Sequence, residues 1–176
     1  DCTALADLTA QTVQCDIQDV DAGLEAYYSP AFYMIPPIDA LMQNTIRINR
    51  SSTADGIELY TTLAHEGYPG HLYQTVYSSL VCDTQTLPIR KLFSYGGYVE
   101  GWAYYTERIS YEYAAQVLAE AEGSLGSSYP AALLCTLLAQ QRDLQINLFC
   151  LLDLSLHYYG AEESELLRSL ESFGLS

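Results

Sequence analysis

The spacing of hydrophobic positions changes after roughly the first third of the chain. Before that point it is typical of short strands: residues 10–20 alternate loosely, and residues 44–50 (NTIRINR) place Ile46 and Ile48 on one face. Residues 27–38, between the two strands, carry three prolines that exclude a helix. The strand at 44–50 is expected to lie at the edge of a small antiparallel sheet.

From Ile57 onward the hydrophobic spacing becomes helical. The pattern predicts helices from residue 57 into His65 and over 71–80, 88–93, 98–121, 131–158 and 161–173, separated by a loop at 82–88, a break at Gly96-Gly97 and a connector at 123–130. We therefore expect a mainly α fold with a small antiparallel β edge (α+β). A chain of 176 residues is long enough for one domain with a sizeable core, so residues 1–176 are expected to form a single domain.

Composition and charge exclude several classes of partner. The hydrophobic fraction of 49% is typical of a globular protein. A net charge of −15, with only seven basic residues, argues against nucleic acid or an anionic membrane as partner. We interpret the acidic surface mainly as a source of solubility, with a preference for cationic substrates as the alternative. No apolar run of about 20 residues predicts a transmembrane helix, and the sequence does not indicate a cellular location.

The five cysteines form no C-x-x-C pair and are odd in number. Cys135 and Cys150 lie in leucine-rich helical segments and are predicted to be small buried hydrophobic residues. A disulfide framework is not expected in a chain of this size.

Candidate chemistry is concentrated in residues 61–74, TTLAHEGYPGHLYQ. A His-Glu pair followed by a second histidine is how a helix offers zinc two nitrogens and a general base. In H-E-x-x-H the histidines are about 40° apart around a helix, whereas six residues place His65 and His71 about 240° apart. Pro69-Gly70 lies between them, and such pairs bend or break helices. The spacing predicts a helix deformed at Tyr68-Pro69-Gly70, which returns His71 to the ion.

Two glutamates of the long helix are candidates for the third zinc ligand. Glu100 and Glu107 are seven residues apart and share one face of a helix, offset by about 20°. Zinc sites built on a His-Glu helix take a third ligand of this kind and leave a fourth position for water. An acidic face exposed to solvent is the alternative. The residues alone do not decide which of the two glutamates is the ligand. The other one, Glu107 if Glu100 is the ligand, is a candidate to hydrogen-bond to a ligand without contacting the metal.

A second polar group interrupts the apolar helix at 131–158. Arg142, Asp153 and His157 fall within about 60° of one another around a helix. They form either a structural cluster of buried ion pairs or a functional group. In the functional reading His157 donates to a developing oxyanion and Asp153 orients it, with Arg142 and Asp153 supporting the site from behind. A third reading makes His157 itself a metal ligand.

Taken together, these segments resemble a known family. HEGYPGHLYQ, YVEGWAYYTE and RDLQINLFCLLDLSLHYYG, preceded by SPAFYMIPPID and NTIRIN, resemble bacterial domain-of-unknown-function family 885 over roughly residues 24–175. The resemblance implies a zincin-like domain, similar to the gluzincin clan of zinc metallopeptidases. It implies metal binding by His65, His71 and Glu100, with Glu66 as general base. Many members carry a second histidine where this chain has Leu72, so only His71 can serve there.

Family members are usually longer than this chain. The resemblance therefore implies that the chain is the C-terminal, catalytic part of a protein whose helical N-terminal part is missing. Such a part can assemble the metal site and still be inactive, because one wall of the cleft would be absent.

The function expected from the sequence is that of a zinc-dependent peptidase. Zn²⁺ would be held by His65, His71 and Glu100, with water in the open position, and Glu66 would take a proton from that water as it attacks a peptide carbonyl. His157 would stabilise the oxyanion. The peptide substrate would pair with NTIRIN as an added edge strand. The alternatives are a non-catalytic binding or structural module that keeps the zincin fold, and a metal-dependent hydrolase of a non-peptide amide or ester.

Overall fold

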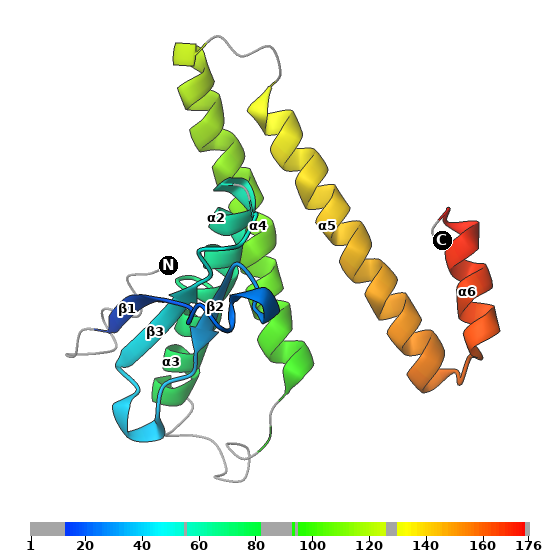
Figure 1. Ribbon diagram of the computed structural model, residues 1–176, viewed down its shortest axis with the longest axis horizontal. Helices are drawn as coiled ribbons and strands as arrows, with labels where there is room; N and C mark the ends of the chain where they lie inside the picture. The colour runs from blue at the N-terminus through cyan, green and yellow to red at the C-terminus, as the bar shows by residue number, and fades with distance from the viewer. Residues whose placement is uncertain (1–12, 55, 82–92, 94, 126–129, 175–176) are drawn as a thin grey trace.

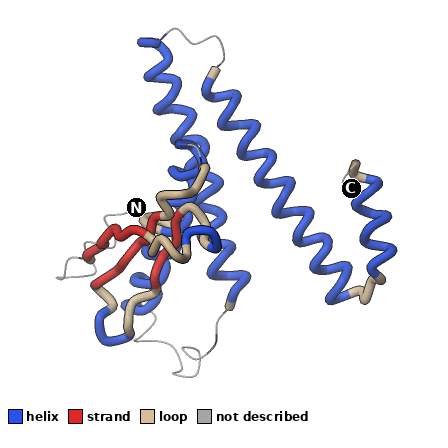
Figure 2. Tube along the Cα trace, viewed as in Figure 1, coloured by secondary structure: helices blue, strands red, loops and turns tan. Residues whose placement is uncertain are grey.

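A computed structural model of the protein describes residues 13–54, 56–81, 93, 95–125 and 130–174. The elements are β1 (Gln14–Asp19), β2 (Ala31–Met34), β3 (Gln43–Ile48), α2 (Gly56–Glu66), α3 (His71–Val81), α4 (Gly96–Leu125), α5 (Ala131–Asp153), a π-helical segment (Leu154–Tyr158) and α6 (Glu163–Ser172), with 3-10 turns at Glu25–Tyr27 and Ile38–Ala40. The fold is mainly helical with one small sheet, as predicted (Figure 2). The predicted loop at 82–88 and helix at 88–93 lie outside the described residues, apart from Phe93, which is in no helix.

The sheet differs from the prediction in two respects. Its strand order is β1-β3-β2, with β1 parallel and β2 antiparallel to β3, so the sheet is mixed rather than antiparallel. The NTIRIN strand is central rather than an edge, because Ile46 pairs with Ile17 of β1 and with Tyr33 of β2. Alternation reports which face of a strand is buried but not the place of that strand in a sheet. The edge strand on the side of the helices is β2, from the proline-rich segment.

The core lies between the sheet and the helices that follow it. Ala31 of β2, Ile46 of β3, and Leu72 and Val76 of α3 form one buried cluster. Leu72 and Val76 are four residues apart, so they share the face of α3 that meets the sheet. Asn44 is also buried, and its side chain is fully engaged: its oxygen accepts from the Tyr33 hydroxyl at 2.7 Å and its amide donates to two backbone carbonyls.

The long helices extend the molecule away from this core. α2 contacts both β2 and α4, and α4 contacts the first part of α5, after which the two helices diverge (Figure 1). Beyond that contact, α5 and α6 form an arm that projects from the body (Figure 1). Cys135, near the start of α5, is buried as predicted, but Cys150, on the arm, is exposed, contrary to the prediction. No described helix combines the length and apolar character needed to cross a membrane.

Candidate metal centre

The helix carrying the motif is broken between the two histidines. α2 ends at Glu66 and α3 begins at His71, with a turn and a cis Tyr68–Pro69 peptide bond between them. Gly70 lies directly against the end of α2, since a Cβ placed on it would stand 1.7 Å from the carbonyl oxygen of His65. Only glycine permits so close an approach of two backbone segments. The turn brings the His65 and His71 rings edge to face with centroids 4.7 Å apart, which confirms the predicted deformation.

Glu100 completes a set of three donors with these histidines. Its Oε2 atom lies 3.6 Å from Nε2 of His65 and 3.6 Å from Nε2 of His71. Tetrahedral ligands at zinc–nitrogen and zinc–oxygen distances of about 2.0–2.1 Å stand about 3.4 Å apart. Two imidazole nitrogens and a carboxylate oxygen are also the donor types that zinc prefers. The three residues therefore offer donors of the types that zinc prefers, and the two distances from the Glu100 oxygen to the histidine nitrogens suit a zinc ion.

Three hydrogen bonds hold α4 so that Glu100 faces the histidines. The indole N–H of Trp102 donates to the Pro69 carbonyl at 2.9 Å, and the Gln74 amide donates to the Tyr98 carbonyl at 3.3 Å. One turn further along α4, the Thr106 hydroxyl donates to the Ala64 carbonyl at 3.3 Å. The start of α4 is thereby fastened to the turn, to α3 and to α2.

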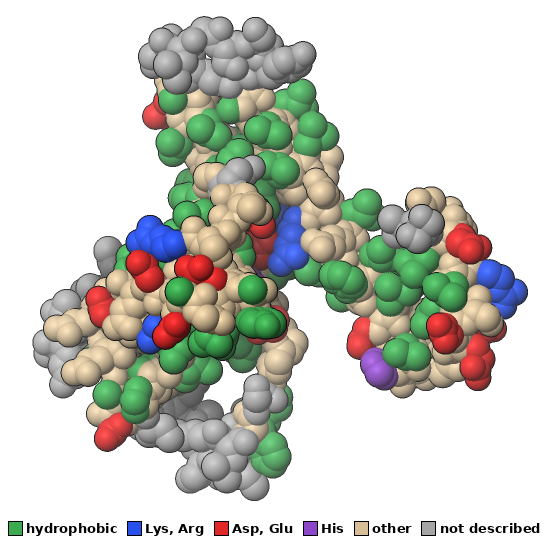
Figure 3. Space-filling model, viewed as in Figure 1, with side chains coloured by type: hydrophobic (Ala, Val, Ile, Leu, Met, Phe, Trp, Pro, Cys, Tyr) green, Lys and Arg blue, Asp and Glu red, His purple; other side chains and the backbone are tan. Residues whose placement is uncertain are grey.

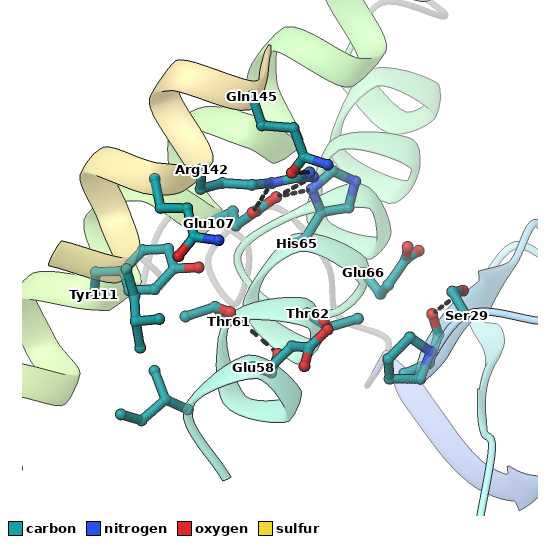
Figure 4. A pocket seen from close by; sticks show the side chains of 15 residues that line it. Ser29, Glu58, Thr61, Thr62, His65, Glu66, Glu107, Tyr111, Arg142 and Gln145 are labelled. Carbon is teal, nitrogen blue, oxygen red and sulfur yellow. Dashed lines mark hydrogen bonds and ion pairs between the residues drawn. The ribbon is translucent and has the colours of Figure 1, made fainter. Parts of the chain in front are cut away.

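Glu107 meets the opposite side of the His65 ring. Its Oε2 lies 2.9 Å from Nδ1 of His65, and its Oε1 accepts from Nε of Arg142 at 2.7 Å (Figure 4). A carboxylate at Nδ1 favours the neutral tautomer with its proton on Nδ1, and in that tautomer Nε2 has its lone pair free for a metal. Glu107 therefore contacts His65 at Nδ1, whereas Glu100 lies near the Nε2 atoms of both His65 and His71.

The same contacts shift the pKa values of this chain of groups. Burial raises the pKa of the Glu107 carboxyl, but the hydrogen bonds from His65 and Arg142 outweigh it, so the net pKa is lowered. Burial lowers the pKa of the His65 imidazole, but the hydrogen bond to Glu107 and the surrounding carboxylates raise it above its usual value. Glu107 is thus an ionised carboxylate that lies between the His65 ring and the Arg142 guanidinium.

Glu66 is held at the edge of the sheet beside the histidines. Its Oε2 accepts the backbone N–H of Tyr33 in β2 at 2.9 Å, and its ligand atom lies within 4.8 Å of those of His65 and His71. A backbone donor fixes the carboxylate without competing for the metal. Sequence reasoning missed this contact, because the prolines on both sides of Tyr33 indicated only an extended or looped segment.

The structure does not bring Asp153 or His157 to the site. Both side chains are 70% exposed, and their closest approach to each other is 3.6 Å. They follow Arg142 by 11 and 15 residues, which is about 16 and 22 Å along a straight helix. Positions on a helical wheel do not include the rise along the axis, which carries the two residues onto the arm, and residues 154–158 are π-helical rather than α-helical. The predicted buried cluster is wrong, and His157 is not placed to stabilise an oxyanion or bind the metal.

A cavity of about 450 Å³ opens beside Glu66 and His65. It runs along α2 toward Ile57, with the residues before β2 on one side and α4 and α5 on the other (Figure 4). α5 contributes Leu138, Gln141, Arg142 and Gln145, whose spacing of three, four and seven residues defines one helix face. Sequence reasoning identified only Arg142 among these four, and the helical spacing is the signal that could have found the others.

Three comparisons relate the chain to known proteins. The profile of the family described as "Bacterial protein of unknown function (DUF885)" matches residues 4–167. No curated protein matches. Among solved structures, the fold is similar to "the putative lipoprotein from Colwellia psychrerythraea", with a TM-score of 0.62 and 22% sequence identity. That match covers 96% of this chain but only 27% of the Colwellia chain, so the present chain spans about a quarter of its length.

Proposed function

The chain belongs to the DUF885 family of bacterial proteins, and on that premise we propose that it is a zinc-dependent, gluzincin-like hydrolase of peptides. Its described elements would form a single zincin-like catalytic domain. One observation carries the proposal: Oε2 of Glu100 stands 3.6 Å from Nε2 of both His65 and His71. Three convergent donors of the types zinc prefers, beside a further glutamate, are the arrangement expected of a hydrolytic zinc site.

His65, His71 and Glu100 would hold the metal. When bound, zinc supplies a Lewis acid that polarises a carbonyl oxygen and lowers the pKa of water. Glu100 is 65% exposed, so the site is open on the side where a substrate would approach. Glu107 keeps His65 in the tautomer that a ligand needs, and Arg142 in turn holds Glu107.

Glu66 would act as the general base. It follows His65 directly and lies beside the histidine nitrogens, where it could take a proton from the attacking water and later deliver it to the leaving amine. The N–H of Tyr33 fixes its carboxylate in this place. Each cycle would consume one water, break one C–N bond and leave a carboxylic acid and an amine.

The substrate would lie along β2 rather than along NTIRIN. β2 is an edge strand, and the N–H of Tyr33 points away from β3 toward Glu66. An extended peptide could add to this edge and bring its carbonyl next to Glu66.

We further propose that the chain is the C-terminal, catalytic part of a longer protein, whose remaining part covers the arm. The Colwellia chain is nearly four times as long as the part matched, and the arm exposes large apolar side chains such as Leu144 and Tyr158. Residues of that remaining part would complete the wall of the cleft on the side of the arm. The present chain could therefore bind the metal and still be inactive.

The proposal is tested by the Glu66→Gln variant on a peptide mixture, read by mass spectrometry after zinc loading. The cleavage rate of the variant should be at least about a hundredfold lower than that of the native chain, because general-base catalysis contributes roughly 10²–10⁴-fold. Glu163→Gln, an exposed substitution of the same kind on α6, should leave the rate unchanged. Full activity in Glu66→Gln would remove the general-base assignment. Absence of cleavage in the zinc-loaded chain and in the longer protein would exclude the peptidase function.

A further inference from the structure

We propose that the cavity beside Glu66 is a substrate subsite that selects a basic side chain, lysine or arginine, next to the bond being cleaved. The proposal rests on the hydrolase function above and adds the class of residue that the site recognises. Its basis is the position of the cavity, the formal charges of its lining residues and the spacing of Glu58 and Glu66 along α2.

The cavity is continuous with the proposed catalytic residues. His65 and Glu66 form its near end, and both belong to the group whose ligand atoms lie within 4.8 Å of one another. Its volume of about 450 Å³ lies within the range of about 300–1,000 Å³ typical of ligand sites. A substrate whose carbonyl reaches Glu66 therefore has a neighbouring residue directly at the mouth of this cavity.

The walls of the cavity carry an excess of negative charge. Four charged side chains line it: Glu58, Glu66, Glu107 and Arg142. Glu107 and Arg142 bind each other at 2.7 Å and neutralise one another. The other two charged lining residues, Glu58 and Glu66, are both acidic, so an acidic side chain would be repelled and a basic one attracted.

The lining also matches the shape of a long basic side chain. Ile57 and Leu138 offer apolar surface for a methylene stem, while Glu58 and Thr62 offer oxygens for a charged head. Glu58 and Glu66 are eight residues apart on α2, which is about 12 Å along the helix axis. A lysine or arginine side chain spans about 6–7 Å, so a residue seated between them brings its head toward Glu58.

The test uses the zinc-loaded chain and a peptide mixture in which cleaved bonds are identified by mass spectrometry. Bonds next to lysine or arginine should be cleaved preferentially over those next to leucine and, most of all, over those next to glutamate. Glu58→Gln should reduce the preference for basic residues by about three- to tenfold, the range expected for one partly exposed charge pair. Glu163→Gln, which changes the net charge equally, should leave the preference intact. Melting temperatures of both variants report any loss of folding.

The outcomes separate this inference from the proposed function. Cleavage without a basic preference, or with one that Glu58→Gln does not change, would overturn the subsite and leave the hydrolase intact. If no peptide is cleaved, the hydrolase proposal fails. The subsite is then tested by the binding of fluorescently labelled lysine and glutamate peptides, measured by fluorescence anisotropy. Tighter binding of the lysine peptide that weakens in Glu58→Gln supports it, and equal binding of both peptides overturns it.

Discussion

At the scale of single residues, the site is a chain of contacts that supports one of the proposed ligands, His65. Arg142 holds Glu107, Glu107 holds His65, and His65 faces Glu100. The motif predicted His65 and His71 as zinc ligands, and the family resemblance implied Glu100 as the third. The residues alone left the roles of Glu100 and Glu107 open, because helical periodicity places both on one face and does not tell which side of the His65 ring each one meets.

Glu107→Gln tests this support directly. The variant should weaken zinc affinity by about 10- to 100-fold, because an amide cannot hold the Nδ1 proton as a carboxylate does. Glu112→Gln is the matched control, since Glu112 is exposed on the same helix and 3.9 Å from Arg108. Affinity is measured by competition with a chromophoric chelator. Equal zinc affinity in Glu107→Gln and in the native chain would show that Glu107 does not support the ligand.

At the scale of elements, the turn between α2 and α3 decides whether the histidines meet. The six-residue spacing and Pro69-Gly70 predicted a deformation, and the structure shows a complete break. The strands were predicted less well. Alternation found NTIRIN, but its central place depends on the parallel pairing with β1, a contact between residues about 30 apart that no local pattern encodes.

Gly70→Ala should abolish stoichiometric zinc binding and destabilise the fold. Its methyl group would collide with the carbonyl of His65, and only a shift of the turn can relieve that contact. Gly101→Ala is the control, because nothing lies within 4 Å of a Cβ at that position. It should keep zinc and stabilise α4 by about 0.5–1 kcal/mol. Metal analysis and thermal melts of both variants check this, and a zinc-replete Gly70→Ala would contradict it.

Asp143 links α5 to α4 and should make their packing sensitive to acid. It accepts hydrogen bonds from Tyr104 and from Arg108, the latter at 3.0 Å. The Tyr104 hydrogen bond, followed by Arg108, lowers the pKa of its carboxyl despite burial. A lowered folded-state pKa contributes stability above the unfolded value of about 3.9 and loses it as the pH falls through the folded value.

The stability difference between the native chain and Asp143→Asn should therefore be largest near neutral pH and shrink below about pH 4. Urea unfolding between pH 7 and pH 3, with chelator present, measures it. Asp153→Asn, exposed on the arm, should show a much smaller difference at every pH. A gap for Asp143→Asn that stays constant across this range would rule out the coupling.

At the scale of the whole molecule, the arm is the part that the sequence described least well. Residues 131–158 are strongly apolar, which predicts burial, yet Leu144 is 70% and Tyr158 77% exposed. Hydrophobic side chains are grouped on the arm among acidic ones (Figure 3). Apolarity predicts that a helix face is covered, but not by which part of a protein. Arg142 and Asp143, near the middle of α5, contact α4, whereas the His157 side chain lies further along the arm and is 70% exposed.

The present chain should associate through the arm when expressed alone, because large exposed apolar patches promote contact. Sedimentation velocity at increasing concentration should show self-association, and Leu144→Gln combined with Leu154→Gln should reduce it. Addition of the remaining part of the longer protein should replace the self-association with a one-to-one complex. A chain that stays monomeric at all concentrations and does not bind the remaining part of the longer protein would contradict the proposed covering of the arm.

The central claim is that His65, His71 and Glu100 hold one zinc ion. Its most direct test is the zinc content of the chain purified without chelators, measured by inductively coupled plasma mass spectrometry in the native chain and in three histidine-to-alanine variants. We expect about one zinc per native chain, none in His65→Ala or His71→Ala, and full content in His157→Ala, whose side chain lies on the arm. A native chain without zinc, or histidine variants that retain it, would contradict the account.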